Sequence, residues 1–216
     1  MKKSLIFLVA CTGLVNLLPA HAASTVDLNV NGVIIPASCT PSLSANGRVD
    51  FGKIAQQDLN LTTGTRLPVK SLGLTVVCNG PVRYALRMRD NRDGSAHVSS
   101  EIYYGLGFDN SANKIGVYSL AFDPKQTVAD AVAEVYGTES TTGGLAWRTA
   151  NRNPIDIGAK SLLGFTDTAG STAGPSAIQN LSSTLTLETV INAKQNLDLS
   201  TDIVMDGSAT LEVVYL

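Results

Sequence analysis

The chain has 216 residues, a formal net charge of −2, and charged side chains at only 16% of its positions. Such a chain lacks the basic surface that nucleic acids and anionic lipid headgroups select, so neither is an expected partner. The length suits one domain with a single sizeable core. Thr, Ser, Gly and Val are plentiful, as is typical of an all-β extracellular protein.

The first 22 residues have the pattern of a secretory signal peptide. Lys2 and Lys3 give a basic start, residues 5–18 are largely apolar, and Ala20-His21-Ala22 is a small-residue cleavage site. We expect the mature chain to begin at Ala23, two charges more negative than the full sequence. No later segment is apolar enough to cross a bilayer.

A competing interpretation concerns Cys11. Leu8-Val9-Ala10-Cys11 resembles a bacterial lipobox, which would place a lipid on this cysteine. The apolar run before Cys11 covers only residues 5–10, and a signal peptide normally has roughly 7–15 apolar residues there. Cleavage after residue 22 is therefore the preferred interpretation.

The mature N-terminus alternates between apolar and polar residues, which predicts a β-strand. This pattern ends near Gly32 and Pro36. Two faces result: Val26, Leu28 and Val30 on one, and Asp27, Asn29 and Asn31 on the other.

Beyond the signal peptide, Cys39 and Cys78 are the only cysteines. Two cysteines in an exported chain most simply form one disulfide. The alternatives are two buried free thiols or a metal site, for which His97 is the only further soft ligand in the mature chain.

Short alternating or apolar segments separated by Gly, Asn and Asp predict a series of strands. Segment 128–136 also fits helical spacing, and we favour a strand there. Segments 138–144 and 166–175 are expected to be loops. The expected strands after the first are 48–52, 72–78, 82–89, 101–108, 114–122, 128–136, 145–148, 183–191 and 208–216.

Segment 82–89 alternates more clearly than any other segment. Its inward face is expected to carry Val82, Tyr84, Leu86 and Met88. Its outward face carries Arg83, Arg87 and Arg89. The arginine row fits either a solvated outer sheet face, which we favour, or a binding stripe.

The chain ends on an alternating strand, and a terminal strand of this kind needs a partner for its open edge. One face carries Thr210, Glu212 and Val214. The other, more apolar face carries Ala209, Leu211, Val213 and Tyr215.

The sequence predicts neither catalysis nor a cofactor. His97, the single histidine of the mature chain, lies among serines after Asp93-Gly94, which indicates a surface loop. No nucleophile elbow, phosphate loop or dinucleotide fingerprint occurs. Residues 90–94 hint at a calcium loop, but Gly94 occupies a ligand position, so a turn is expected and no metal.

Several motifs in their order resemble a chaperone–usher fimbrial (pilin) subunit. They are the alternating N-terminus, the Gly32 to Cys39 stretch, Val49-Asp50-Phe51-Gly52, Lys114 to Leu120, a second cysteine ending a strand, and a final strand with Tyr215 next to last. More narrowly, they resemble the bacterial family of probable major subunits of beta-fimbriae. The resemblance covers essentially the whole mature chain.

This resemblance implies an all-β, immunoglobulin-like antiparallel β-sandwich of the incomplete pilin type, exported through the periplasm to the cell surface. Residues 32–216 would form the single domain and residues 23–31 an N-terminal donor-strand extension. A periplasmic chaperone, an outer-membrane usher and neighbouring subunits would be the partners. Val26, Leu28 and Val30 would be the donor residues. Ala209, Leu211, Val213 and Tyr215 would line the acceptor groove.

Other functions stay open at this stage. The protein could be a fimbrial tip adhesin, with a host or surface glycan bound by loops of the 90–180 region. It could also be a soluble periplasmic binding protein whose N-terminal strand completes its own sandwich. Donor segments of the family carry a glycine within the apolar row, whereas here Gly32 stands at its end.

Overall fold

The structure is a computed structural model that describes residues 24–34 and 37–216. It divides into two units, Met1–Ile35 and Pro36–Leu216. The predicted signal peptide, residues 1–22, and the lipobox cysteine Cys11 lie outside the described residues. The sequence placed the start of the domain at residue 32, whereas the structural division follows Ile35.

In the first unit, residues 24–34 carry no strand or helix. The three expected donor side chains are almost fully exposed, Val26 at 94%, Leu28 at 87% and Val30 at 87%. Val33 and Ile34 are exposed to the same degree. The strand expected here is therefore not formed within the chain, because an alternating segment becomes a strand only when a neighbour supplies backbone partners.

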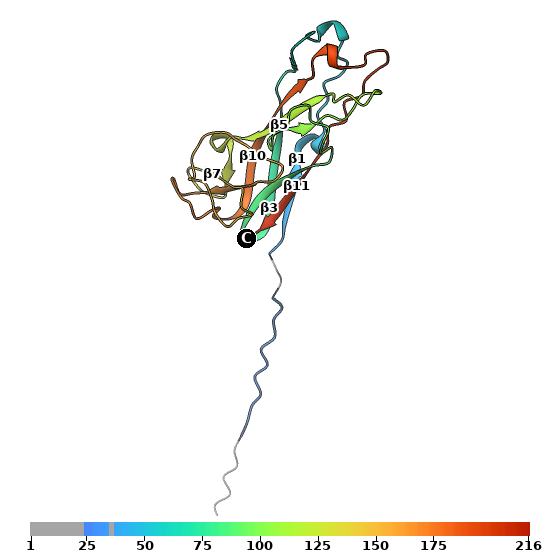
Figure 1. Ribbon diagram of the computed structural model, residues 1–216. Helices are drawn as coiled ribbons and strands as arrows, with labels where there is room; N and C mark the ends of the chain where they lie inside the picture. The colour runs from blue at the N-terminus through green and yellow to red at the C-terminus, as the bar shows by residue number, and fades with distance from the viewer. Residues whose placement is uncertain (1–23, 35–36) are drawn as a thin grey trace, which may run out of the picture. The chain divides into compact units, whose positions relative to one another are not determined.

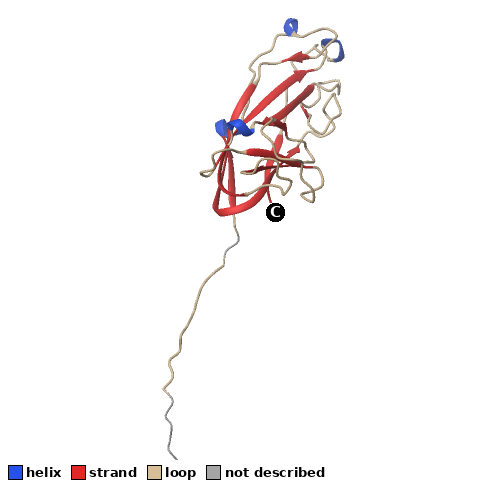
Figure 2. Cartoon of the chain, turned by 90° about the vertical axis from the view of Figure 1, so that its left-hand side faces the viewer, coloured by secondary structure: helices blue, strands red, loops and turns tan. Residues whose placement is uncertain are grey.

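The second unit is an all-β sandwich in which every strand pair is antiparallel, as predicted (Figures 1 and 2). Its helices are single 3₁₀ turns: η1 (Ser44–Gly47), η2 (Gln56–Asp58), η3 (Pro124–Gln126) and η4 (Lys194–Asn196). Its strands are β1 (Cys39–Leu43), β2 (Thr65–Arg66), β3 (Lys70–Asp90), β4 (Tyr104–Gly105), β5 (Gly116–Phe122), β6 (Val128–Ala129), β7 (Tyr136–Ser140), β8 (Ile155–Asp156), β9 (Leu162–Thr166), β10 (Ala177–Ile191) and β11 (Ala209–Tyr215).

The long strand β3 belongs to both layers of the sandwich. Its first half pairs with β1 on one edge and β10 on the other, and β10 continues to β5 and β4. Its second half pairs with β11 on one edge and β9 on the other, and β9 continues to β7. At Asn79, Gly80 and Pro81, which the sequence had indicated as a break between two strands, the pairing of β3 with β10 only shifts its register. The strand changes layer after Arg83, the last residue paired with β10, because Tyr84 already pairs with β11.

The core lies between the two layers. Leu74, Leu86, Tyr104 and Phe122 are completely buried. Phe122 of β5 meets Phe165 of β9 edge to face, with ring centroids 6.3 Å apart. Because these rings come from different layers, their contact closes the sandwich at its centre.

The predicted disulfide joins Cys39 to Cys78. The two residues lie opposite each other where β1 pairs with β3. The bond therefore attaches the first strand of the domain covalently to the strand shared by both layers.

Segment 48–52, predicted as a strand, is not paired into one. Ala45, Asn46 and Gly47 have positive φ, and this turn directs the chain away from the ladder of β1. The Asp50 carboxylate then accepts a hydrogen bond from the Gly52 N–H at 2.7 Å, which closes a second local turn. Val49 still packs against the core.

Other differences concern short segments. Only Tyr104–Gly105 of segment 101–108 is a strand. Segment 128–136 is neither helix nor continuous strand, because Asp130 has a φ of 47° and turns the chain after β6. Residues 138–140, expected in a loop, belong to β7. Residues 145–148, expected in a strand, form a loop, and the indole N–H of Trp147 donates a hydrogen bond to the Gly144 carbonyl there.

Candidate functional site: a groove between the two edge strands

Two edge strands, β1 and β11, lie on the same side of the sandwich. Each is paired with β3, and no other strand of residues 24–34 and 37–216 pairs with either of them. β10 and β9 occupy the opposite edge of β3 in the two layers. The backbone edges of β1 and β11 that are not paired with β3 therefore lie on the same side of the unit, and the two strands are neighbours there (Figure 1).

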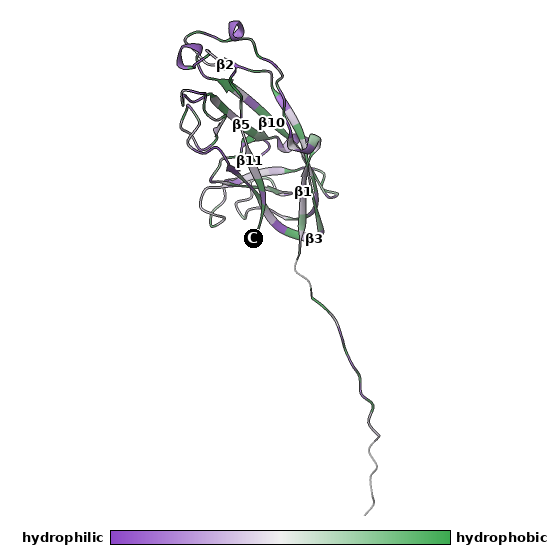
Figure 3. Ribbon diagram, turned by 90° about the vertical axis from the view of Figure 1, so that its right-hand side faces the viewer, coloured by the Kyte–Doolittle hydropathy of each residue, from purple (hydrophilic) through white to green (hydrophobic). Residues whose placement is uncertain are grey.

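The apolar face of β11 is only partly covered. Ala209, Leu211 and Val213 pack against the core but stay half-buried, and Tyr215 is 47% exposed. Hydrophobic and hydrophilic residues also alternate along β3 (Figure 3). Its inward side chains Tyr84, Leu86 and Met88, by contrast with those of β11, are buried, as predicted. The apolar side chains of β11 are therefore less completely covered by the rest of the sandwich than those of β3.

A cavity of about 150 Å³ lies between the last residue of β1 and the first residue of β11, and we call it the edge groove. One wall is formed by Leu43 of β1 with Val49 and Phe51, and the other by Gly207 and Ala209. The floor is apolar apart from Thr189, whose buried hydroxyl has no hydrogen-bond partner among the described residues. The remaining floor residues are Leu72, Met88, Leu106, Tyr118, Leu120, Leu185 and Leu187.

At the ends of β1 and β11 away from the edge groove, the backbone N–H of Cys39 donates to the Tyr215 hydroxyl at 2.7 Å. This contact holds the start of β1 against the end of β11, and we call this end the C-terminal pole. Of the four residues expected to line an acceptor groove, Ala209 lines the edge groove, whereas Leu211, Val213 and Tyr215 lie further along β11.

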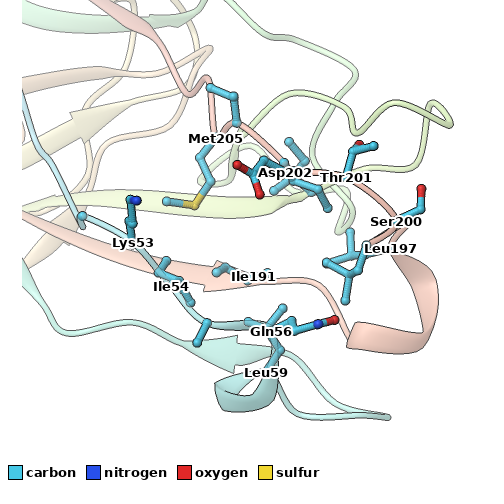
Figure 4. Close-up of a pocket in the computed structure, with 16 residues that line it drawn as sticks. Lys53, Ile54, Gln56, Leu59, Ile191, Leu197, Ser200, Thr201, Asp202 and Met205 are labelled. Carbon is cyan, nitrogen blue, oxygen red and sulfur yellow. The ribbon is translucent and has the colours of Figure 1, made fainter.

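A larger cleft of about 700 Å³ lies beyond the other end of β11, and we call it the distal cleft. In Figure 4, Lys53, Ile54 and Gln56 come from one side, Asp202 and Met205 from the other, and Ile191 lies between them. The 3₁₀ turns η2 and η4 mark this end of the unit, opposite the C-terminus (Figures 1 and 2).

A buried carboxylate fixes the loop that forms one wall of the distal cleft. Asp109 accepts hydrogen bonds from the backbone N–H groups of Asp198 at 2.7 Å, Asn113 at 2.8 Å and Ser111 at 2.9 Å. Burial alone would raise the pKa of Asp109, but these donors and the Asn113 amide outweigh it and hold the pKa below its usual value. Asp198 in turn accepts from Ser111 and Ser200, which lowers its pKa to about 2.

Asp90 and Arg87, also considered from the sequence, have structural partners, whereas Nδ1 of His97 is buried without one among the described residues. Asp90 accepts from the N–H groups of Arg92 and Gly105, so it fixes the predicted turn. Arg87 forms an ion pair with Glu212 at 2.7 Å on the outer face of the sheet. His97 is half-buried, and burial lowers its pKa.

The described residues contain no group of three or more His, Cys, Asp or Glu side chains that could hold a metal ion. Within the same residues, no helix has the length and apolarity needed to span a membrane.

Sequence reasoning missed several residues of the site. Leu43 lies outside every strand predicted from the sequence, and Phe51 was predicted in a strand but not in a groove wall. The distal cleft is made by two loops, 52–59 and 197–205, that lie far apart in the sequence. The apolar residues at 54, 59, 197, 199 and 203 of these loops were the available signal, since exposed loops rarely carry so many.

The chain is similar in sequence to known proteins of similar length. A family described as "Protein of unknown function (DUF1120)" matches residues 28–103. "Uncharacterized protein YhcF" of Escherichia coli (strain K12) is 25% identical over 228 residues, covering 91% of this chain and 93% of the relative. "Protein GltF" of the same organism is 25% identical over 251 residues, covering 100% of this chain and 99% of the relative.

Proposed function

We propose that the protein is a structural subunit of a bacterial surface fimbria, assembled by donor-strand complementation. One observation supports this most directly: the sandwich has two free edges around a half-covered core, and residues 24–34 carry an exposed alternating apolar row. An added strand in the edge groove could pair with β11 and cover its apolar face. Each buried Val or Leu of that strand would contribute roughly 1.5–3 kcal/mol.

The position of the extension distinguishes a strand supplied by the same chain from one supplied by the next. The extension joins β1 at Cys39, which lies at the C-terminal pole beside Tyr215. If the same chain folded back into its own groove through residues 35–38, its strand would run parallel to β11. A strand antiparallel to β11 must therefore come from another copy.

The antiparallel orientation is favoured, since antiparallel pairs are slightly more stable per residue. It places the end of the donor segment at the distal cleft, so the next copy would sit at that end and leave its own groove open. Such a head-to-tail contact does not close on itself and builds a filament. A parallel donor would give a self-completed monomer or a closed dimer.

The partners and the location belong to the same proposal. A half-open core would be covered in the periplasm by a strand of a pilus chaperone, exchanged at an outer-membrane usher for the extension of the next subunit. The finished fibre would lie on the cell surface. No catalytic activity is part of this function.

The test is co-expression of the mature chain with a periplasmic pilus chaperone, followed by a denaturing gel without heating. We expect a ladder of multimers that collapses to monomer on boiling. Leu28→Asp and Leu211→Asp should abolish the ladder, because the first places a charge in the apolar row of the donor and the second places one on the half-buried face of β11 that the donor would cover. A lone monomer band from the unaltered chain would contradict the proposal.

Matched controls come from the outward faces of the same segments. Asn29→Asp and Thr210→Asp introduce the same charge one residue away, where the side chain points to the other face of the strand. Both should keep the ladder. Loss of the ladder in these controls as well would show that charge alone, and not its position in the groove, prevents assembly.

A further inference from the structure

The edge groove and the distal cleft follow one another along the same path. Ala209 lines the groove, Met205 lines the cleft, and both pack against the same core. On the opposite wall, Phe51 lines the groove and Gly52 lines the cleft. A strand that fills the groove and continues past Ala209 therefore enters the cleft.

The apolar row of the extension is longer than β11. β11 has 7 residues, which span roughly 23 Å at 3.3 Å per residue. The row from Val26 to Ile34 includes every second residue and spans roughly 30 Å. Ile34 is 99% exposed and shares the face of Val26. A donor paired along the whole of β11 must therefore extend beyond one end of it.

Strand geometry restricts how the two segments can match. Residues directly opposite each other in an antiparallel pair point to the same face. Placing Leu28 opposite Leu211 satisfies this rule for the whole row. The remaining opposite pairs are then Val26 with Val213, Val30 with Ala209, Gly32 with Gly207, and Ile34 with Met205.

The surroundings of Gly207 select this register. A Cβ atom at Gly207 would lie 3.0 Å from Leu106 Cδ2 and 3.0 Å from Tyr118 Cε1, so these two side chains lie close beneath the backbone at this position. A residue without a bulky side chain opposite Gly207 lets the donor backbone lie close over them as well. Gly32 is such a residue, whereas a shift by two residues would place Val30 or Ile34 there.

We infer that the distal cleft receives Ile34 from the extension of a second copy of this chain, with Gly32 crossing over Gly207. This inference rests on the proposed function and adds the register and the second half of the binding site. The cleft offers Ile54, Leu59 and Met205 as apolar partners for Ile34. The inferred register also explains why a glycine follows Val30. With Ile34 included, Gly32 lies within the apolar row and not at its end.

Site-specific cross-linking tests the register in the full mature chain co-expressed with the chaperone. Ile34→Cys is combined with Met205→Cys, and a short bis-maleimide reagent is added before boiling and reducing. The native cysteines do not react because they are joined in a disulfide. We expect covalent multimers from this pair, at least about tenfold more than from either single variant, because opposite Cβ atoms lie within about 5.5 Å.

The matched control pairs Val26→Cys with Met205→Cys, since Val26 is at the other end of the row. An antiparallel donor leaves this pair unlinked. Covalent monomer or dimer from it would mean a parallel donor and would overturn the inference. An unheated ladder without a covalent Ile34–Met205 product would overturn the inference and leave the proposed function standing. Absence of the ladder itself would overturn the proposed function.

Discussion

Strands β10 and β11 have similar sequence patterns and opposite surroundings. β10 is paired with β3 on one edge and β5 on the other, and its inward residues Leu181 and Leu185 are each 2% exposed. β11 is paired with β3 alone among the described strands, and its inward residues Leu211 and Val213 are half-buried.

The difference shows that alternation gives a strand its two faces but does not determine how far either is buried. Burial depends on the strands and layers placed around it. The part of the core under β10 is closed to solvent, whereas the part under β11 is half exposed. Four experiments test this contrast between the two strands.

The largest effect is expected from losing the disulfide, which holds the other wall of the edge groove. The sequence separation between Cys39 and Cys78 is 39 residues. Closing such a loop stabilises the fold by about 4 kcal/mol in the chain-entropy model. Replacing both cysteines with serine should lower the free energy of unfolding by about that amount, measured by urea denaturation. A change below about 1 kcal/mol would show that the β1–β3 ladder holds this wall unaided.

Truncating one leucine in each strand tests the contrast itself. Leu185→Ala should lower the free energy of unfolding by about 3 kcal/mol, because it leaves a cavity in a closed core. Leu211→Ala should lower it by about 1 kcal/mol in the isolated subunit, since that side chain is already half in water. The same change should weaken the multimer ladder. Equal losses for both variants in the monomer would mean that the core at β11 is already complete.

A smaller effect is expected from the hydrogen bond at the C-terminal pole. Tyr215→Phe removes the acceptor for the Cys39 N–H and should lower the free energy of unfolding by about 1 kcal/mol. Tyr84, opposite Tyr215 in the ladder, is a matched control, since its buried hydroxyl has no partner among the described residues. Tyr84→Phe should be neutral or stabilising, so a loss there as large as at Tyr215 would argue against the assigned contact.

The smallest effect is local and depends on pH. The folded pKa of Asp109 lies below its ordinary value of 3.8, so its stabilising contribution is complete above that value and is lost as pH falls through the folded pKa. Amide protection at residues 111, 113 and 198 should therefore be constant from neutral pH to about pH 4 and decrease below it. Hydrogen exchange measures this, corrected for the intrinsic rate.

The variant Asp109→Asn serves as the reference for this experiment. It cannot titrate, and it should show weak protection at those three amides at every pH. An acid-dependent loss of protection in this variant as well would assign the effect to another carboxylate, such as Asp198.

The strands most visible in the sequence are those whose two faces differ sharply. The alternation of 208–216 predicted β11 to within one residue at each end, and the inward set from Val82 to Met88 was correct. The cysteine pairing followed from having only two cysteines beyond the predicted signal peptide. These features are local, so no knowledge of neighbouring segments was needed.

The walls of the site could not be predicted in the same way. β1 contains Pro41 and only five residues, and it is a strand because the disulfide and β3 hold it there. Val49 and Phe51 look like a strand but have no backbone neighbour. The distal cleft depends on the folding of loops 52–59 and 197–205 against one another, which no pattern within either loop reports.

The 21-residue strand β3 has a mechanical consequence in a fibre assembled as proposed. Tension on a subunit would enter through its own extension at Cys39 and leave through the donor held by β11. Both points connect to β3, one through the disulfide at Cys78 and the other through the ladder between Tyr84 and Asp90. The load would therefore pass along one continuous backbone and shear the β11 ladder lengthwise, so its hydrogen bonds would resist together and not open one at a time.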